Sequence, residues 1–485
     1  MFLKKTKRNG RVYLSVVQNY RQDGKVRSKT IESLGYVDEL VRFYPDPINF
    51  FTQQVAQMNH EREAQGGSVL LTIDRDERIE PDRPGAIQLG SAIALGYLDL
   101  FGVGKSLALH PHAGRVLELL VSARMLHAVP VHETWNSRNK FTRTCDFSYS
   151  QVFASFEDLA EVGPSLVRSL NARYDRVRGP RLLDNVRIVF SNYVFNWPDD
   201  DASGGPDEMG LQGRARLCLA IDGGGIPYAY RMVPYDMDAD QMVDLVLSLK
   251  DEVGARHAML VAAQLLPEAV AVMDALTANG DDFVLLQPAE SLARETIEWI
   301  NDPEGYDRTR NGAYGIKSHR IARHLTDSSD EARDLKEIAL RSSSATGTQA
   351  FCIVSSEVDR SDAAIFNVYR ELWRVHEPFQ VISADFIQTP YPLDARTHLK
   401  AHFLVCYVAF FLLRVLRQDM DWRFNAAEVA DALLAMEGAY VSENWYVFNY
   451  RTAVTDAVQQ AAGVPVGKRL MSRAEIRGVP ALISA

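Results

Sequence analysis

The first thirty residues form a basic cluster of the kind that binds phosphate groups. They contain nine basic side chains against one acidic side chain, Asp23, which is a balance of +8. Because the whole chain has a formal net charge of −10, the remaining residues carry −18. Salt screens this acidic remainder beyond about 10 Å, so the cluster can still bind phosphates locally. A solvated, charged edge of a sheet is the alternative interpretation. The predicted phosphate contacts are Lys4, Lys5, Lys7, Arg8 and Arg11.

A second basic group lies further along the chain, at Arg138, Lys140 and Arg143, with Trp135 and Phe141 close by. Basic and aromatic side chains in alternation suit phosphate contact supported by stacking. We therefore predict that these three residues also bind nucleic acid. The alternative is a charged helix face whose aromatic residues belong to the core.

Two other patterns are too incomplete to predict a site. Gly102–Ser106 resembles a phosphate-binding loop, but that motif requires a glycine where Asp99 stands. His110 and His112 have no cysteine or carboxylate at the spacing of a zinc site. We expect a turn between helices and a polar turn, respectively.

Composition indicates a globular protein with several modules. The chain has 485 residues, of which 47% are apolar and 24% charged, more than one hydrophobic core usually organises. Its four cysteines form no CxxC pair, which argues against a disulfide framework and favours a cytoplasmic location. Residues 1–8 have no apolar segment behind them, so we expect no signal peptide. The apolar run Phe403–Leu413 is about half as long as a membrane helix, so we predict a buried helix and no membrane partner.

The spacing of apolar residues predicts a chain that changes from β to helical to mixed structure. Arg11–Val17 and Lys25–Ser33 alternate around a turn and predict a hairpin. Helical spacing follows, and then strands alternate with helices, which favours an α/β core. The predicted divisions are a basic N-terminal β module (1–60), a linker (61–85), a helical DNA-binding region (86–180), a first core segment (181–290), an insertion (291–350), a second core segment (351–424) and a C-terminal helical tail with one helix (425–485).

Several fragments, in order, resemble insertion-sequence transposases of the DDE type. Ala220–Asp222 with Gly225–Pro227 is similar to their second-strand hairpin, and Thr296–Trp299 to their insertion. Lys400–Cys406 is similar to their last core helix. The resemblance implies an RNase H-like mixed sheet interrupted by a mostly β insertion, with DNA as partner and a homodimer as the working form.

The three carboxylates of that family are replaced in this chain. Val189 stands at the position of the first aspartate, Ala263 at the second, and His376 at the glutamate. The family's chemistry needs these carboxylates because they hold two Mg²⁺ ions about 4 Å apart. We therefore expect no cofactor, and Mg²⁺ only if residual nuclease activity exists.

Neighbouring acidic residues are the competing explanation. Asp184, Asp222, Glu377 and Asp385 lie near the replaced positions in sequence. A shift of one residue turns a side chain to the other face of a strand, or by about 100° around a helix. Displaced carboxylates are therefore poor substitutes.

The leading hypothesis is a transposase-derived DNA-binding protein, catalytically inactive and domesticated, located in the cytoplasm and on the nucleoid when bound to DNA. The first alternative is an active metal-dependent transposase that uses the displaced carboxylates. The second is a scaffold that binds proteins and no DNA.

Overall fold

The computed structural model divides the chain into two compact units, Met1–Glu77 and Arg78–Ala485. It describes residues 2–8, 10–22, 25–41, 44, 46–64, 85–194, 214–234, 237–262, 269–287, 292–308, 314–323, 332–344, 347–382, 385, 393–442 and 444–484. Most of the predicted linker, 61–85, lies outside these residues. Each unit has its own core and is treated separately.

The first unit is a three-stranded antiparallel sheet with two helices. Its strands are β1 (Phe2–Arg8), β2 (Arg11–Gln22) and β3 (Lys25–Tyr36), with β2 in the centre. The predicted hairpin is therefore confirmed. The helices α1 (Val37–Leu40) and α2 (Pro47–Ala64) correct the prediction of an all-β module. They are needed because a three-stranded sheet cannot bury its apolar side chains alone, and α2 packs against β1.

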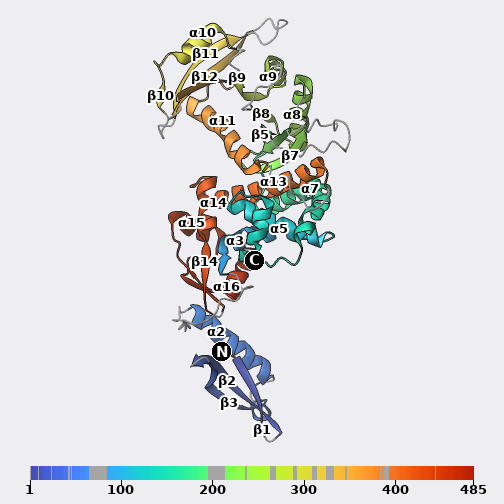
Figure 1. Ribbon diagram of the computed structural model, residues 1–485, viewed down its shortest axis with the longest axis vertical. Coiled ribbons are helices and arrows are strands. Elements are labelled where there is room, and N and C mark those ends of the chain that lie inside the picture. The colour runs from blue at the N-terminus through green and yellow to red at the C-terminus, as the bar shows by residue number, and fades with distance from the viewer. Residues whose placement is uncertain are drawn as a thin grey trace. The chain divides into compact units, whose positions relative to one another are not determined.

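The second unit begins with a helical region, as predicted. The short strand β4 (Ala86–Gln88) leads into α3 (Leu89–Leu100), α4 (Val103–Ser106), α5 (Pro111–Leu126), α6 (Val131–Ser137) and α7 (Tyr149–Arg178). Helix α7 starts at a capping box in which the side chains of Ser148 and Gln151 each accept from the other's backbone N–H. Helix α13 (Ala395–Asp419) packs against α5 and α7 (Figure 1).

Helix α13 is the apolar helix that the sequence predicts, but it is longer than expected. By length and composition it could cross a membrane, yet 94% of its apolar window is buried inside the protein. Among its residues, Phe403 and Phe411 are fully buried. A helix that is apolar all round is explained by burial on every side.

A nine-stranded sheet lies beside these helices. Its order is β10-β11-β12-β13-β9-β8-β5-β6-β7. The strands β5 (Asn185–Val194), β6 (Arg214–Ile221) and β7 (Pro227–Val233) form an antiparallel meander. On the other side of β5, β8 (His257–Ala262) and β9 (Asp282–Gln287) run parallel to it. The helices α8 (Ala239–Val253) and α9 (Ala269–Ala278) connect these parallel strands, as predicted.

The two faces of this sheet bury different helices (Figure 1). Ile188 and Phe190 of β5 share a core with residues of α8 and α9. Val189, one residue between them, belongs to the core that includes α13 and α11 (Asp362–His376). This alternation is what a strand buried on both faces requires.

The predicted insertion extends the same sheet and forms no separate core sheet. It contains α10 (Arg294–Asn301), β10 (Asp307–Arg308), β11 (Tyr314–Arg323) and β12 (Arg333–Ser344). Strand β13 (Gly347–Ser355) pairs with both β12 and β9, which joins the insertion to the core. The described residues of this segment are mostly β, as expected, and its status as an insertion into a family core stays a prediction.

The prediction of a C-terminal tail with one helix is wrong. This segment contains α14 (Ala426–Ala435), β14 (Glu437–Ser442), β15 (Trp445–Phe448), α15 (Ala453–Ala462), β16 (Leu470–Ser472) and α16 (Arg473–Ser484). Its strands form a sheet with β4 in the order β16-β15-β14-β4, in which β14 pairs with β4, about 350 residues earlier in the chain. Strands this short give almost no local signal, because their stability comes from distant pairing.

A glycine in α3 tests the docking of the C-terminal segment. A Cβ added at Gly90 would lie 2.1 Å from the backbone oxygen of Leu433 in α14. We expect Gly90→Ala to lower the free energy of unfolding by about 1–3 kcal/mol, because a backbone atom cannot move aside as a side chain can. Urea unfolding measures the change. Gly478→Ala in α16 is the control, since its Cβ meets no atom within 4 Å and alanine favours a helix. Equal stability of the two variants would contradict this packing.

Candidate functional site

Val189, the predicted position of the first family aspartate, lies in the middle of β5 and is buried in the apolar core. Its side chain is 2% exposed. In the parallel pairing of β5 with β8 it lies opposite Val261. Helix α11, which follows the insertion, packs against both strands and contributes Ile365 and Tyr369 to the same core. The fold therefore places Val189 on the face of the sheet that α11 covers. Helix α11 carries His376, the third predicted position.

The other two replaced positions are described only in part. Ala263 follows the last residue of β8 and lies outside the described residues. His376 is the last residue of α11, and its side chain also lies outside them. Among the residues that the structure describes, no three His, Cys, Asp or Glu side chains are grouped so that they could hold a metal ion. The valine at position 189 offers no ligand to a hard cation such as Mg²⁺.

Two of the predicted substitutes lie at the opposite end of the strand. Asp184 precedes β5, five residues or roughly 16 Å along the strand from Val189. Its side chain is 81% exposed and lies 3.7 Å from the Arg256 guanidinium. Asp222 follows β6, whose last residue, Ile221, pairs with Arg187 near the start of β5. Neither carboxylate is placed to serve the position of Val189.

Asp222 has a structural role instead. Its carboxylate accepts from the Ile226 N–H at 2.8 Å and lies 3.3 Å from the fully buried guanidinium of Arg181. Arg181 also donates to Asn171 and to the Pro227 carbonyl. Burial raises the pKa of Asp222, while the Ile226 N–H and Arg181 oppose the shift. A buried pair with these hydrogen bonds holds the β6–β7 turn against the end of α7.

Asp385 lies in a small cavity between α5 and α13. Its carboxylate accepts from the Val131 N–H at 2.6 Å, and Arg124, His398 and His402 also line the cavity. Burial raises the pKa of Asp385 to about 6 and lowers the pKa of His398 to about 3. The pKa of His402 is also well below its ordinary value because of burial. The cavity thus offers one carboxylate beside neutral imidazoles, which is too little charge for two metal ions.

The remaining substitute, Glu377, begins the short 3-10 helix Glu377–Phe379 directly after α11. Its side chain lies outside the described residues. The backbone places it next to His376, so it keeps the rotation of about 100° that the sequence predicts between neighbouring helical positions. Its use in catalysis stays a prediction.

The basic residues of the first unit differ in how available they are. Lys4, Lys5 and Lys7 on β1 are exposed. Lys5 and Lys7 share one face of the sheet and Lys4 lies on the other, so the three form no single flat patch. Arg11 lies 2.7 Å from Asp38 and 2.6 Å from Glu39 in ion pairs. The side chain of Arg8 lies outside the described residues.

Two further exposed basic residues, Arg27 and Lys29 on β3, are not among the predicted contacts. Their spacing of two on a strand that alternates is visible in the sequence. The sequence alone does not show how β2 and β3 pair, so these two residues could be counted there only as part of the net charge.

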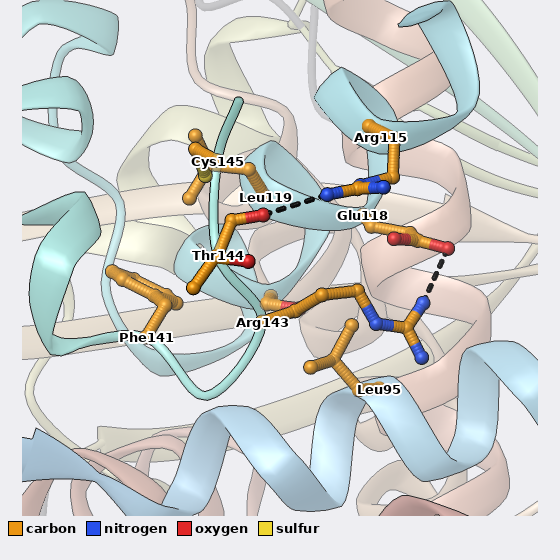
Figure 2. Close-up of a pocket in the computed structure, with 9 residues that line it drawn as sticks. Leu95, Arg115, Glu118, Leu119, Phe141, Arg143, Thr144 and Cys145 are labelled. Atoms are coloured by element: carbon orange, nitrogen blue, oxygen red, sulfur yellow. Dashed lines mark hydrogen bonds and ion pairs between the residues drawn. The ribbon is translucent and has the colours of Figure 1, made fainter. Parts of the chain in front are cut away.

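The second predicted basic group is largely occupied by contacts within the protein. Figure 2 shows the Arg143 guanidinium turned toward Glu118 of α5, with the two charged groups 2.6 Å apart. A second carboxylate, Asp99, lies 3.1 Å from the same guanidinium. Lys140 pairs with Glu437 at 3.2 Å. Among the described residues, Arg138 is the only member of this group that lies over an aromatic ring. Its guanidinium carbon is 3.9 Å from the centroid of the Trp135 ring.

Arg143 therefore connects α3, α5 and the loop that follows α6 through its ion pairs. The carboxylates raise its pKa against the opposing effect of burial. A phosphate would have to displace both carboxylates to bind there. The sequence leaves open whether Arg143 binds nucleic acid or belongs to a charged helix face. Its two ion pairs favour the charged face.

The raised pKa of Asp385 gives a test by pH. A carboxyl group that binds its proton more tightly when folded adds stability at low pH and loses it as pH rises through about 6. Relative to Asp385→Asn, we expect the wild type to gain up to roughly 3 kcal/mol of unfolding free energy between pH 7 and pH 4. Urea unfolding across this range measures it.

Asp394→Asn is the control of opposite sign. Asp394 accepts from the Thr397 N–H at the start of α13, and its pKa is lowered by such hydrogen bonds although burial opposes them. The advantage of the wild type over this variant should fall as pH decreases. Identical pH profiles for the wild type and Asp385→Asn would contradict the buried, protonated carboxyl.

Comparison with known proteins bears on the first unit. The N-terminal domain of the IS1634 family of transposases matches residues 3–67. A chain of a pre-cleavage Mos1 transpososome has 13% identity and a TM-score of 0.15, over 51% of this chain and 70% of that one. The Mos1 strand transfer complex gives 12% identity and the same score and coverage. No match was found among curated proteins. The N-terminal segment of the chain is thus similar to the N-terminal domain of IS1634 family transposases, which confirms the resemblance to insertion-sequence transposases over residues 3–67.

Proposed function

We propose that this chain is a transposase-derived DNA-binding protein whose catalytic centre has been replaced by apolar core. The observation that carries the proposal is Val189. It stands at the position of the first catalytic aspartate, faces the helix after the insertion, and is buried with Val261 and Ile365. A DDE centre cannot hold two metal ions when this position offers no oxygen.

The topology of the sheet supports an RNase H-like core. Numbered from β5, the first five strands lie in the order 3-2-1-4-5, with a meander followed by two parallel strands. The insertion begins after the fifth strand, and α11 follows it. This is the arrangement in which Val189 on the first strand and α11 belong to the same site.

Binding to DNA is supported by the first unit. Residues 3–67 are similar to a transposase N-terminal domain, and Lys4, Lys5 and Lys7 are exposed in that segment. Contacts to phosphate need accessible cations and no particular sequence. Arg11 and Arg143 are weaker candidates because carboxylates already pair with them.

An active enzyme that uses displaced carboxylates is less well supported. Asp184 and Asp222 lie at the wrong end of β5, and Asp222 pairs with a buried arginine. Glu377 and Asp385 would supply two carboxylates at most. Self-association and location on the nucleoid stay predictions from the resemblance.

The absence of catalysis can be tested directly. We expect supercoiled and linear DNA to remain intact with the purified protein in Mg²⁺ or Mn²⁺, because Val189 provides no metal ligand. Denaturing gels detect single nicks. Metal-dependent nicking that is lost in the Glu377→Gln, Asp385→Asn double variant would overturn the proposal. Nicking that both proteins share would indicate a contaminating nuclease and calls for a second purification before the comparison is scored.

The phosphate contacts predict a specific salt dependence. If the three lysines of β1 each contact one phosphate, Lys4→Ala, Lys5→Ala, Lys7→Ala should reduce the slope of log Kobs against log[salt] by about 2 to 3. Fluorescence anisotropy on a labelled duplex measures this slope.

A matched triple variant removes three exposed positive charges from the second unit. Arg294, Arg320 and Arg451 are 91%, 60% and 79% exposed, and each pairs with an exposed carboxylate. Their replacement by alanine should leave the slope unchanged. Equal slopes for the wild type and the lysine variant would remove the proposed contacts. No retention of DNA at low salt would favour the protein-binding scaffold.

A further inference from the structure

We infer that the segment of the β2–β3 hairpin beyond the three-stranded sheet is a base-reading ribbon that enters the major groove of double-stranded DNA. This inference rests on the proposed function, because it assumes that the chain binds DNA. It adds which element reads the sequence and in which groove. The ribbon consists of residues 18–22 of β2 and 25–29 of β3.

The register of the sheet separates this ribbon from the rest of the unit. Strand β1 pairs with β2 only from Arg11 to Val17, where Phe2 lies opposite Val17. Among the described residues, those from Gln18 to Gln22 of β2 pair only with β3, in an unbroken antiparallel register that ends at Gln22 and Lys25. A five-residue extension at about 3.3 Å per residue projects roughly 17 Å. The major groove, about 12 Å wide, admits a two-stranded ribbon of this kind.

Two bulges in β3 lie at the base of the ribbon. Ile31 has no partner between the pairs Val16 with Glu32 and Val17 with Thr30. Leu34 likewise has no partner between the pairs Ser15 with Ser33 and Leu14 with Gly35. Bulges bend a strand and increase its twist, so they can turn the ribbon relative to the sheet. The three-stranded part of the sheet packs against α1 and α2. The ribbon extends beyond the residues of β2 that pair with β1.

The ribbon carries positive charge and exposed polar groups. Arg27, Ser28 and Lys29 are all exposed. In a sheet with one face packed on a core, every second side chain of such a segment would be buried. Arg27 and Lys29 are two residues apart and therefore share a face, and Lys29 lies opposite Gln18. Lys25 continues the same spacing in the sequence. The two strands contain no acidic residue between 18 and 22 or between 25 and 29.

These side-chain types match the chemistry of base edges. An arginine can donate two hydrogen bonds to O6 and N7 of guanine, and a glutamine can pair with adenine. A lysine cluster such as that on β1 binds phosphates without such discrimination. The first unit thus separates affinity, which depends on Lys4, Lys5 and Lys7, from sequence preference, which depends on Arg27.

The test compares sequence selection by variants of the full-length protein. A pool of 30-base-pair duplexes with a randomised centre is enriched by the wild type, Arg27→Ala and Thr30→Ala. Thr30 is also exposed on β3 and is the matched control. We expect the wild type to enrich a guanine-containing site and Arg27→Ala to lose preference at one base pair or more, by about tenfold. Thr30→Ala should select the same site as the wild type.

Methylation at guanine N7 then tests the groove. Dimethyl sulfate modifies N7 in the major groove, so the bound wild type should protect a guanine that Arg27→Ala leaves exposed. Arg27→Lys keeps the charge and loses the planar fork, so it should retain the salt slope and lose the protection. Circular dichroism establishes that each variant is folded before its binding is scored.

The outcomes separate the two proposals. Salt-sensitive binding with the same selected site and the same protection in the wild type and Arg27→Ala would overturn the ribbon and leave DNA binding intact. Protection confined to the minor groove would overturn it as well. No binding of any duplex at low salt would overturn the proposed function itself.

Discussion

Burial of helix α13 is the constraint on which the second unit depends. Its central run, Phe403–Leu413, is apolar on every side, and 94% of the helix's apolar window is buried. The helices α5 and α7 cover one region of its surface, and β7 contacts another. Each fully buried aromatic or aliphatic side chain contributes roughly 1.5–3 kcal/mol relative to its exposure to water. Exposing these side chains would therefore cost more free energy than the total free energy of unfolding of a typical domain.

The same core explains why a valine at position 189 suits the folded protein. Val189 joins α11 and α13 in one continuous apolar cluster. An aspartate there, without a metal ion, would place an unpaired carboxyl group in the interior, which is costly even when it becomes protonated. Valine replaces this cost with favourable burial. At this buried position the apolar residue is the more stable choice, and an aspartate alone would destabilise the protein.

Local patterns were enough to predict the elements whose own sequence carries an apolar period or a turn signal. The β2–β3 hairpin, the strands and helices of the first core segment and α13 follow from alternation, helical spacing and turn residues. The sheet formed by β4, β14, β15 and β16 could not be predicted, because residues 86–88 pair with residues 437–439 across most of the chain. The face of Val189 was likewise predictable from its strand, whereas the burial of Asp222 with Arg181 depends on a tertiary contact that no local pattern contains. Arg143 shows the same limit: its charge is visible in the sequence, but the carboxylates of Glu118 and Asp99 that pair with it are not.

The uneven distribution of charge gives the two units different relations to DNA. Beyond residue 30 the chain carries −18, so the acidic remainder repels phosphates wherever its charges come within a Debye length. Binding is then favoured only where exposed cations outnumber carboxylates, which holds for β1 and for the strands of the β2–β3 ribbon. Repulsion elsewhere also reduces non-specific adhesion along the duplex, since unpaired basic residues on the second unit would otherwise add affinity without selectivity. Under the proposed function, the effect of the chain on DNA depends on occupying chosen sites, and this distribution of charge favours such selectivity.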